Sequence, residues 1–483
     1  MTEQQQSPIR SESIPLCVSL GRALLKSDVL VEAMVRMVQK DILNLFRLLL
    51  WRARGRDVLE ERVAARSELD VTVLPVNEEL LGWLKDQRQC RRLVLWVPMH
   101  VFAAEQICAH DGLFDEVITA GSFAESEGES KAARLVQKFG AQGFDYAGHE
   151  VSDMPVWRLA RRAFVVEPGW RLRRQLVRLP NVEKTFAGKS TAYRAWLLEL
   201  RLHQWSKNVL LFLPAAGAHL LLRPQIAFEC IAAFIIFGCC ASGTYLLNDL
   251  MDLDSDRRHP TKRLRPFAAG DLPLLAGLAV APALVGGGLL LAWLVLGWAF
   301  FATLTGYVVA TVWYSRSLKR IPMVDVLTLA GLYSLRVIAG SAATLLLPSF
   351  WLLALTMFLF LSLAVAKRYS ELKLMMASGR TQTLGRGYTV DDAPLLQSCG
   401  LSAGYISVLV MALYVNSDMA QRSYVHVQLL WLLCPLLLYW ITRVWIKTSR
   451  GQMDDDPVVF TMRDRPSIIV ACAALLLVVA AAQ

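Results

Sequence analysis

The pattern of apolar and polar positions changes near residue 190. Before that point short β-rich apolar runs alternate with stretches of helical character, and after it long apolar runs dominate. The segments between the short runs are long enough for crossover helices, which predicts a Rossmann-like parallel sheet with helices on both faces. The stretch from Val29 to about Arg56 is a predicted helical insertion after the first strand. The predicted strands are residues 16–20, 91–98, 114–120, 144–148 and 164–168.

Nine apolar stretches from residue 192 onward are candidate membrane spans. A helix needs about 20 residues to cross a bilayer, and several of the stretches meet that length, although the first and the fourth are short. The pattern therefore predicts an α/β domain over residues 1–190 and an all-α polytopic membrane domain of about nine helices over residues 191–483. The stretches lie near 208–222, 225–247, 273–295, 297–314, 323–346, 349–366, 400–415, 427–446 and 466–482.

The loops between the spans predict an orientation. Lysine and arginine concentrate in residues 257–265, 316–320, 367–386 and 443–465, and the loops expected on the opposite side carry almost none. The positive-inside rule places basic loops in the cytoplasm. We therefore expect a multi-pass protein of the cytoplasmic (inner) membrane, with the N-terminal domain and the candidate site in the cytoplasm and the C-terminus outside.

Composition agrees with a membrane protein that carries a soluble part. Of the 483 residues, 55% are hydrophobic and 19% are charged, against a usual range of about 45–50% and about 25%. Basic membrane loops account for the net charge of +10, so we expect no nucleic-acid partner. The nine cysteines are scattered without a C-x-x-C pair, which indicates buried thiols with no metal or disulfide role. The polar N-terminus has no apolar core of a secretory signal.

The strongest chemical signal lies in residues 248–266. Asp249, Asp252 and Asp256 fall within roughly 60° of one face if the segment is helical, and Asn248 extends that face. Converging carboxylates repel one another unless a cation lies among them, and hard oxygen ligands favour Mg²⁺. The segment therefore predicts chemistry on a diphosphate at a lipid boundary; the alternative is a solvated, charged loop. Five bases follow the acids: Arg257, Arg258, Lys262, Arg263 and Arg265.

A second polar cluster follows the fourth predicted span. Tyr314 and Lys319 precede Asp325, which is either part of a site or a cap of the next helix. Arg336 lies 11 residues further on, on the same helical face and about 16 Å deeper. An arginine inside a span is a functional hypothesis by default: it could hold a lipid phosphate, or it could form an internal ion pair without a ligand.

These residues carry a resemblance that runs from about residue 195 to the C-terminus. The motif N-D-x-x-D-x-x-x-D, formed by Asn248, Asp249, Asp252 and Asp256, resembles the signature of the UbiA-type prenyltransferase superfamily. Within it the chain is similar to the branch of decaprenyl-phosphate phosphoribosyltransferases. The branch-specific pieces are residues 201–208 (RLHQWSKN), 259–266 (HPTKRLRP), Tyr314-x4-Lys319, Lys367-Arg368-x2-Glu371, 386–388, 454–457 and 464–466.

The resemblance implies a reaction and assigns residues to it. A magnesium-dependent enzyme of this branch moves 5-phosphoribose from phosphoribosyl diphosphate to a polyprenyl phosphate and releases diphosphate, for lipid-linked arabinofuranose and cell-envelope glycan synthesis. By motif position Asp249, Asp252 and Asp256 would bind the metal and, with Lys262, act in catalysis. The implied substrate contacts are Asn248, Arg265, Lys207, Lys319, Tyr314 and Asp325, with Arg336 and Arg201 for the acceptor phosphate.

Other functions stay open at this point. An aromatic prenyltransferase of the same superfamily would take a prenyl diphosphate as donor; the region from Tyr314 to Asp325 lacks the paired aspartates expected of that class, which favours the phosphoribosyl reaction. A non-catalytic membrane scaffold and a transporter are further alternatives. The polyprenyl length, a downstream phosphatase or epimerase as partner, and a homo-oligomeric state are not determined.

Residues 13–170 resemble a haloacid dehalogenase-like phosphatase domain, by the order of strands, the insertion, and residues 144–148 followed by 153–157. The motifs of that family are altered. Ser19 stands in place of the nucleophilic aspartate, Gly21 in place of the acid–base aspartate and His149 in place of a metal-binding aspartate, and residues 97–100 offer no clear serine or threonine. Asp153 remains, and Lys131 matches the family lysine. We expect a catalytically inactive phosphatase domain, a pseudophosphatase that serves as a scaffold, lid or partner surface.

Overall fold

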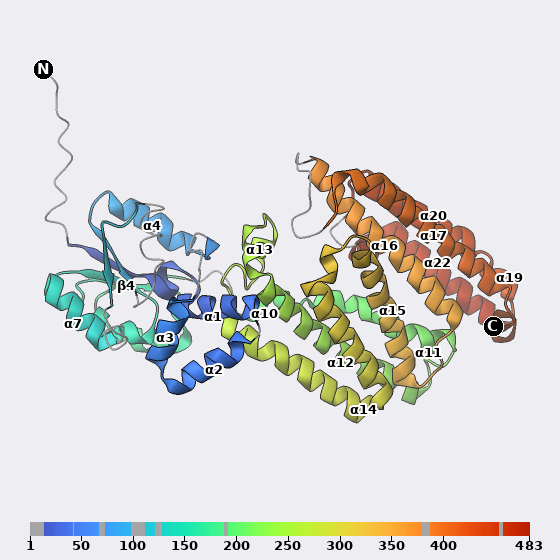
Figure 1. The fold of residues 1–483 in the computed structure, drawn as a ribbon, viewed down its shortest axis with the longest axis horizontal. Coiled ribbons are helices and arrows are strands. Elements are labelled where there is room, and N and C mark those ends of the chain that lie inside the picture. The colour runs from blue at the N-terminus through green and yellow to red at the C-terminus, as the bar shows by residue number, and fades with distance from the viewer. Residues whose placement is uncertain are drawn as a thin grey trace, which may run out of the picture. The chain divides into compact units, whose positions relative to one another are not determined.

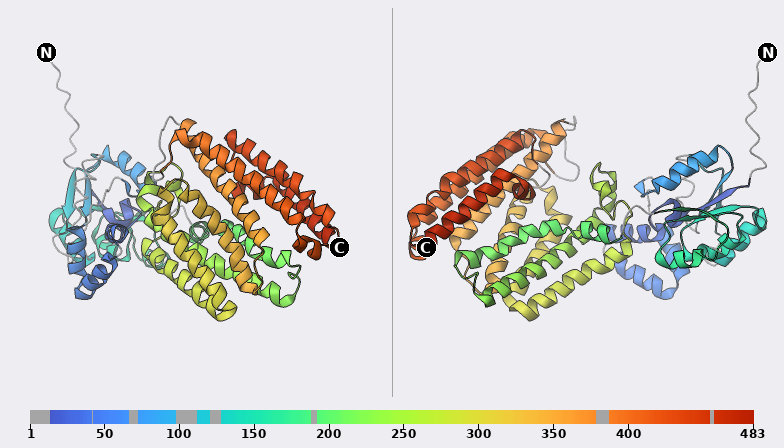
Figure 2. Two further views of the ribbon diagram at one scale, coloured as in Figure 1. Left: turned by 45° about the vertical axis from the view of Figure 1, so that its right-hand side comes forward. Right: turned by 180° about the vertical axis from the view of Figure 1, so that it is seen from behind.

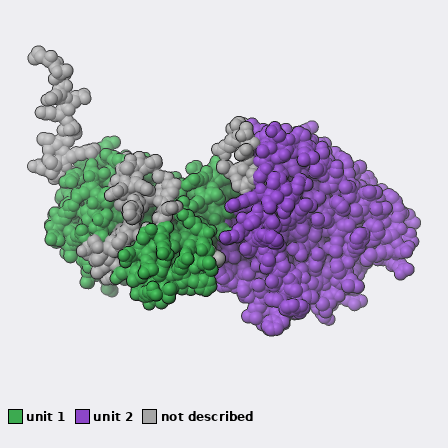
Figure 3. Space-filling model, in the orientation of Figure 1, with its two compact units in different colours: residues 1–200, 249–279 green, residues 201–248, 280–483 purple. Residues whose placement is uncertain are grey.

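The chain divides into two compact units, which Figure 3 shows in different colours. Unit 1 contains Met1–Leu200 and Asp249–Ala279, and unit 2 contains Arg201–Asn248 and Val280–Gln483. Segment 249–279 thus groups with the N-terminal residues, while the domain boundary at residue 190 stays a prediction from hydropathy. The structure is a computed structural model that describes residues 14–41, 43–66, 73–97, 112–120, 128–187, 192–377, 387–453 and 457–483.

Unit 1 is built on a parallel sheet of six strands in the order β3-β2-β1-β4-β5-β6 (Figure 1). Leu16 of β1 pairs with Leu93 on one side and with Asp145 on the other, so the order reverses at β1, as in doubly wound folds. The predicted parallel sheet is confirmed. The strands are β1 Leu16–Ser19, β2 Leu93–Val97, β3 Glu116–Thr119, β4 Asp145–Gly148, β5 Ala163–Val166 and β6 Val182–Phe186.

Helices cover both faces of this sheet. Successive strand residues point to opposite faces, so Val18 packs with helix α4 (Glu78–Arg88), whereas Cys17 packs with α7 (Gly128–Phe139) and α8 (Met154–Leu159). The short elements η3 (Val151–Asp153) and α9 (Trp170–Leu176) complete this α/β part, and η1 (Leu20–Leu24) follows β1. Each fully buried large apolar side chain contributes about 1.5–3 kcal/mol to folding.

The predicted insertion after the first strand is three helices, α1 (Val29–Lys40), α2 (Asn44–Arg54) and α3 (Arg56–Ala64). The carboxylate of Asp28 caps α1 by accepting a hydrogen bond from the Leu30 amide at 2.9 Å. The three helices enclose a small apolar core of their own, which contains Met37, Leu48, Trp51, Leu59 and Val63.

Unit 2 is helical (Figure 2). Its helix α16 packs against both α15 and α17. Gly340 of α15 lies against the backbone of Leu211, where an added Cβ would stand 2.1 Å from the carbonyl oxygen, so a larger residue would push these segments apart.

The elements after residue 190 are α10 (Ala192–Glu199), η4 (Leu202–Phe212), α11 (Leu213–Gly217), α12 (Pro224–Met251), α13 (Leu253–Arg258), η5 (Lys262–Leu264), α14 (Leu274–Arg316), η6 (Leu318–Arg320), α15 (Val324–Thr344), α16 (Phe350–Ala377), η7 (Val390–Asp392), α17 (Ala393–Val415), α18 (Asp418–Ser423), α19 (Val427–Leu430), α20 (Leu433–Ser449), α21 (Pro457–Arg463) and α22 (Arg465–Ala482).

Among the described residues, seven helices are long and apolar enough to cross a membrane. The expected count of about nine is not confirmed, for two reasons. The third and fourth predicted spans are two halves of α14 that meet at Gly297, whose φ of +80° and ψ of −176° interrupt the helix. The first predicted span, residues 208–222, is a 3₁₀ segment and a short helix instead. The candidates are Pro224–Met251, Leu274–Arg316, Val324–Thr344, Phe350–Met376, Val390–Val415, Val427–Ser449 and Arg465–Ala482.

Candidate functional site

The acidic motif begins at the end of α12 and continues into α13, with a break between the two helices. The helix stops at Met251, and Asp252 has φ −95° and ψ 9° before the short helix α13 begins. The expectation of a continuous helix was wrong at this residue. The break sets Asp249 and Asp256 close together around one cation, and both carboxylates are buried.

That cation is the guanidinium of Arg265. Its Nη1 atom donates to Asp249 Oδ1 at 2.9 Å and to Asp256 Oδ2 at 2.5 Å. Burial raises the pKa of the Asp256 carboxyl above its ordinary value, and the charge of Asp249 adds to the rise, while Arg265 and Lys262 oppose it. Two buried carboxylates therefore depend on a positive charge between them.

Within the described residues, no group of three His, Cys, Asp or Glu side chains is gathered for a metal ion. The assignment of Asp249, Asp252 and Asp256 as metal ligands therefore rests on the sequence motif alone. The donor chemistry nevertheless fits Mg²⁺, because buried carboxylate oxygens are hard ligands and already surround a cation. Asp252 is half-buried, and its carbonyl accepts a hydrogen bond from Ser255 Oγ at 2.8 Å.

The turn that follows holds Lys262. The Nδ1 atom of His259 faces the amides of Thr261 at 3.3 Å and Lys262 at 3.4 Å, so the histidine closes the turn between α13 and η5. The basic half of the motif is therefore an ordered turn, in which Arg258 and Arg263 are exposed. Lys262 itself is half-buried.

Sequence reasoning missed what holds this segment within unit 1. The guanidinium of Arg257 donates to both carboxylate oxygens of Glu32 of α1, at 2.6 and 3.0 Å. Arg36 lies 3.3 Å from Asp254, and Gln39 donates to the carbonyl of Leu250. One signal existed: Glu32 interrupts an apolar run of α1, and an acid at a buried position needs a partner.

In unit 2, Tyr314 and Asp325 meet around an arginine. The Tyr314 hydroxyl donates to Asp325 Oδ1 at 2.7 Å, and Arg368 Nε lies 2.5 Å from Asp325 Oδ2. Arg368 also pairs with Glu371. Met323 is the N-cap residue of α15, so Asp325 does not cap that helix. It forms a buried ion pair with Arg368 instead. Lys319 lies in η6 and is half-buried.

Arg336 is buried in unit 2, and its described partners are neutral. It donates to Asn208 Oδ1 at 3.2 Å, to the Leu332 carbonyl at 2.9 Å and to the Tyr307 hydroxyl at 2.9 Å. The alternative of an internal ion pair is therefore wrong for the described residues. The ring of Tyr333 lies between two of the predicted cations, 5.5 Å from Arg336 and 5.7 Å from Lys207.

Two further predicted residues lie elsewhere in unit 2. Arg201 precedes η4 in a left-handed conformation, with its guanidinium 5.3 Å from the centre of the Tyr245 ring. Asn248 is half-buried near the end of α12. Four residues of the branch-specific pieces, Arg386 and Asp454 to Asp456, lie outside the described residues.

Several residues that the resemblance to a phosphatase domain singled out gather at the carboxyl ends of the strands in unit 1. Lys131 Nζ lies 2.8 Å from Asp153 Oδ1 and 3.4 Å from Ser19 Oγ, and the Tyr146 hydroxyl donates to Asp153 Oδ1 at 2.9 Å. Burial alone would raise the pKa of Asp153, but the charge of Lys131 and the donated hydrogen bonds hold it below its ordinary value. His149 donates its amide to the same carboxylate at 3.0 Å. Residues 98–100 lie outside the described residues.

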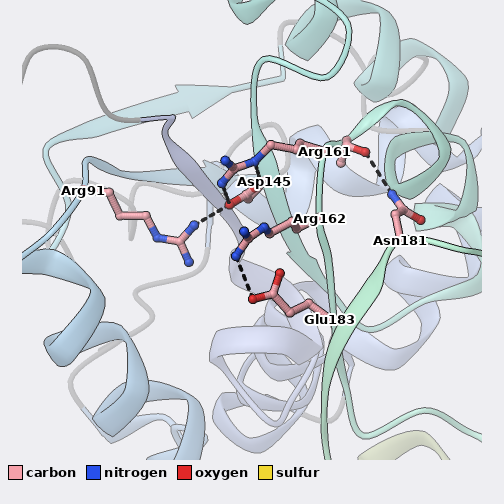
Figure 4. Close-up of polar contacts among 7 residues, drawn as sticks. Arg91, Asp145, Arg161, Arg162, Asn181 and Glu183 are labelled. Carbon is pink, nitrogen blue, oxygen red and sulfur yellow. Dashed lines mark hydrogen bonds and ion pairs between the residues drawn. The ribbon is translucent and has the colours of Figure 1, made fainter.

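A shallow pocket of about 450 Å³ at the opposite ends of the strands was not expected from the sequence. Figure 4 shows Arg91 and Arg161 directed at the buried Asp145, and Arg162 at Glu183. The side-chain charges here are paired with one another, which is typical of a structural ion-pair network. The lining residues are Trp83, Gln87, Arg91, Arg162, Phe164, Glu183 and Lys184.

Several known proteins and solved structures resemble this chain. An uncharacterized protein of Sinorhizobium fredii, y4nM, is 32% identical over 458 residues, which are 94% of this chain and 88% of that protein. The decaprenyl-phosphate phosphoribosyltransferase of Corynebacterium glutamicum is 36% identical over 183 residues, 37% of this chain and 55% of that enzyme. A solved structure of a UbiA homolog from Archaeoglobus fulgidus bound to GPP and Mg²⁺ matches with a TM-score of 0.45 and 17% identity, over 59% of this chain and 99% of that one.

The family model of the UbiA prenyltransferase family matches residues 210–463, which is more than half of the chain. The match runs from the end of η4 to α21 and includes the acidic motif at the end of α12, whereas α22 lies beyond it. Apolar helices of membrane-spanning length and this match together identify an integral, multi-pass membrane protein. The chain belongs to the UbiA prenyltransferase family.

Proposed function

We propose that the protein transfers 5-phosphoribose from phosphoribosyl diphosphate to a polyprenyl phosphate and releases diphosphate. The observation that carries the proposal is the buried pair Asp249 and Asp256 with Arg265 between them. Such a pair can exchange one positive partner for another, which is what binding of a cation and a polyphosphate requires. The 36% identity with a decaprenyl-phosphate phosphoribosyltransferase supports this donor over a prenyl diphosphate.

The proposed reaction needs no strong general base. The bond between the anomeric carbon and the diphosphate oxygen breaks, and its electron pair leaves with the diphosphate. A non-bridging oxygen of the acceptor phosphate, already anionic, forms the new bond to that carbon. Lys262 and Arg265 would neutralise charge on the leaving group. Mg²⁺, for which Asp249, Asp252 and Asp256 are the proposed ligands, would supply further neutralisation of that charge when bound.

For the acceptor phosphate we propose Arg336, with Lys207 and Arg201. Arg336 is buried in unit 2 among neutral partners, so its charge is not cancelled by a described carboxylate. A buried arginine inside a span is expected to serve an anionic ligand or a structural pair. Asn248, Lys319, Tyr314 and Asp325 are proposed substrate contacts by motif position alone.

The N-terminal α/β domain is, in this proposal, an inactive phosphatase relative. Phosphatases of the haloacid dehalogenase class need a nucleophilic aspartate, and Ser19 occupies that position here. Asp153, a carboxylate that shares Lys131 with Ser19, is already engaged by Lys131 and Tyr146. A separate phosphatase or epimerase would then act on the lipid product, on the way to lipid-linked arabinofuranose and cell-envelope glycan. We propose the inner membrane as the location, with the site facing the cytoplasm.

The test is a transfer assay on membranes that contain the full chain. Labelled phosphoribosyl diphosphate, decaprenyl phosphate and Mg²⁺ should give a labelled lipid, and Asp249→Asn or Asp252→Ala should abolish it. Asp254→Asn is the matched control, because Asp254 lies on the same segment outside the motif and pairs with Arg36. The same membranes should release no phosphate from p-nitrophenyl phosphate.

A parallel reaction distinguishes the alternatives. Membranes receive geranyl diphosphate and an aromatic acceptor in place of the phosphoribosyl donor. Prenylated product in this reaction, with none in the first, would assign the chain to the aromatic prenyltransferases. Absence of product in both, from protein that is folded and inserted, would favour a non-catalytic scaffold.

A further inference from the structure

Helix α2 exposes an apolar face in unit 1. Phe46, Leu49 and Leu50 are 68%, 61% and 52% exposed, and Leu45 and Ala53 lie on the same side. Figure 1 shows α2 between α1 and α3 in the insertion. The α/β part of a protein seldom leaves a contiguous apolar patch in water, and such a patch usually marks a binding surface or a membrane contact.

The exposed face is not needed to fold the insertion. Leu48 and Trp51 on the opposite side of α2 are buried in the core that α1, α2 and α3 share. At 100° per residue, Leu48 and Trp51 fall about 140–160° from Phe46 and about 100–160° from Leu49. The helix is thus apolar on two opposite sides, and only one of them has a partner in the described structure of unit 1.

Arginines separate the two apolar faces. Arg47 and Arg54 fall along one boundary, and Arg52 falls along the other. All three side chains are exposed, and Arg47 donates to Asn44 Oδ1 at 2.8 Å. An apolar face flanked by basic side chains is the pattern of a helix that lies in the plane of a bilayer surface, with long cationic side chains at the level of the lipid phosphates.

The contacts of α1 bring the insertion to the end of a membrane span. Arg257 binds Glu32, Arg36 lies close to Asp254, and Gln39 binds the Leu250 carbonyl, all within unit 1. Leu250 is the penultimate residue of α12, a candidate span. The helix next to α2 is therefore fixed to the residues at which the chain leaves the bilayer.

We propose that α2 is an interfacial helix that binds the anionic phospholipid surface of the membrane in which the protein is embedded. Phe46, Leu49 and Leu50 would enter the outer part of the acyl region, and Arg47, Arg52 and Arg54 would contact lipid phosphates. The chemistry requires an anionic headgroup and an apolar interior, which a bilayer supplies together. The proposal does not depend on which reaction the protein catalyses.

The experiment uses the full chain in nanodiscs of phosphatidylcholine with phosphatidylglycerol. A photoreactive benzophenone amino acid replaces Phe46 or Leu49 and, as a matched control, Glu61, which is exposed on α3 of the same insertion. After irradiation, intact-mass spectrometry should find phospholipid adducts several-fold more often at positions 46 and 49 than at 61. Phosphatidylglycerol should be enriched in the adducts, and Arg47→Gln with Arg52→Gln and Arg54→Gln should remove that enrichment.

Two results would overturn the proposal. Equal adduct yields at 46, 49 and 61 would mean that α2 is not in the bilayer surface. Protein–protein cross-links at 46 or 49 would also contradict it. Cross-links that disappear on dilution to one chain per nanodisc would assign the face to a second copy. Cross-links that persist would assign it to another part of the same chain. Because the replaced side chains are exposed, the variants should fold like the parent, and circular dichroism of each variant checks this.

Discussion

The carboxylate of Glu32 and the guanidinium of Arg257 form a buried, bidentate ion pair between residues 225 positions apart in the sequence. Glu32 belongs to the insertion of the α/β part, and Arg257 belongs to the segment that carries the acidic motif. The geometry of that segment is therefore tied to a residue outside the family signature.

Replacing Glu32 by alanine should destabilise unit 1 strongly. Arg257 would stay buried without its partner, and breaking one side of a buried pair costs about 3–5 kcal/mol. The melting temperature of the purified full chain should fall, and transfer activity should fall with it. Lys26→Ala provides the control, because its pair with Asp271 is partly exposed and should contribute less than about 1 kcal/mol. Equal losses in the two variants would contradict the role assigned to the Glu32 pair.

Asp256→Asn should separate activity from stability. Burial raises the pKa of this carboxyl in the folded state above its ordinary value. A raised folded pKa means that the ionised form costs stability at neutral pH, and the cost fades as the pH falls through that raised pKa. The asparagine removes the cost, so the melting temperature at neutral pH should stay the same or rise, whereas transfer should drop by about 10²-fold or more.

The pH–rate profile gives a second measurement for the same group. Transfer by the parent chain should fall on the acid side as Asp256 takes up a proton. Arg265→Ala removes the cation that lowers this pKa, so the acid limb should move to higher pH. A limb at the same pH in both proteins would show that the ionisation of Asp256 does not govern the rate.

The Asp325 and Arg368 pair should respond to double substitution. Arg368→Met alone leaves the buried carboxylate of Asp325, so this variant should lose about 3–5 kcal/mol. Asp325→Leu alone should lose less, because Arg368 keeps its pair with Glu371. The double variant should recover much of the loss seen in Arg368→Met, because the carboxylate that remains, Glu371, is partly exposed. Tyr314→Phe, which removes one hydrogen bond to Asp325, should cost only about 1 kcal/mol. Thermal melts in detergent measure all four variants.

Arg336→Lys should weaken acceptor binding more than it slows the chemical step. Lysine keeps the charge, but its single ammonium group cannot replace the hydrogen bonds that the planar guanidinium donates to Asn208, Leu332 and Tyr307. We expect the KM for decaprenyl phosphate to rise on the order of tenfold, about 1.4 kcal/mol, with a smaller change in kcat. Arg223→Lys, at an exposed position before α12, should leave both constants unchanged. A fall in kcat alone would place Arg336 outside acceptor binding.

Local pattern predicted most of the fold, and its failures have identifiable causes. Five strands and the insertion follow from apolar runs, but β6 was missed because Val182–Phe186 carries mainly polar, exposed side chains at the sheet edge. The run near residue 208 is apolar enough for a span, but hydropathy does not distinguish a 3₁₀ segment from an α-helix. The break at Gly297 lies where the predicted spans 273–295 and 297–314 divide, although both halves belong to one continuous apolar element.

The candidate site was predicted by residue type and less well by geometry. The motif indicated that Asp249 and Asp256 act together, and the structure pairs them through Arg265, which the sequence suggested only as a substrate contact. The helical-face argument failed at Asp252 because it assumed an unbroken helix. Long-range partners such as Glu32 and Arg368 depend on tertiary packing, which spacing along one segment cannot reveal.

The 3₁₀ segment η4 has a consequence for how the chain is threaded through the membrane. If α12 crosses a bilayer, the contact between Glu32 and Arg257 predicts that residues 201–223 cross it as well, because both ends of that path then belong to one side. At about 2.0 Å per residue in η4 and about 1.5 Å in α11, the two elements extend about 30 Å, close to the thickness of the hydrocarbon layer. A 3₁₀ segment extends further than an α-helix of the same number of residues, and on this prediction it would place Lys207 and Asn208 within the membrane.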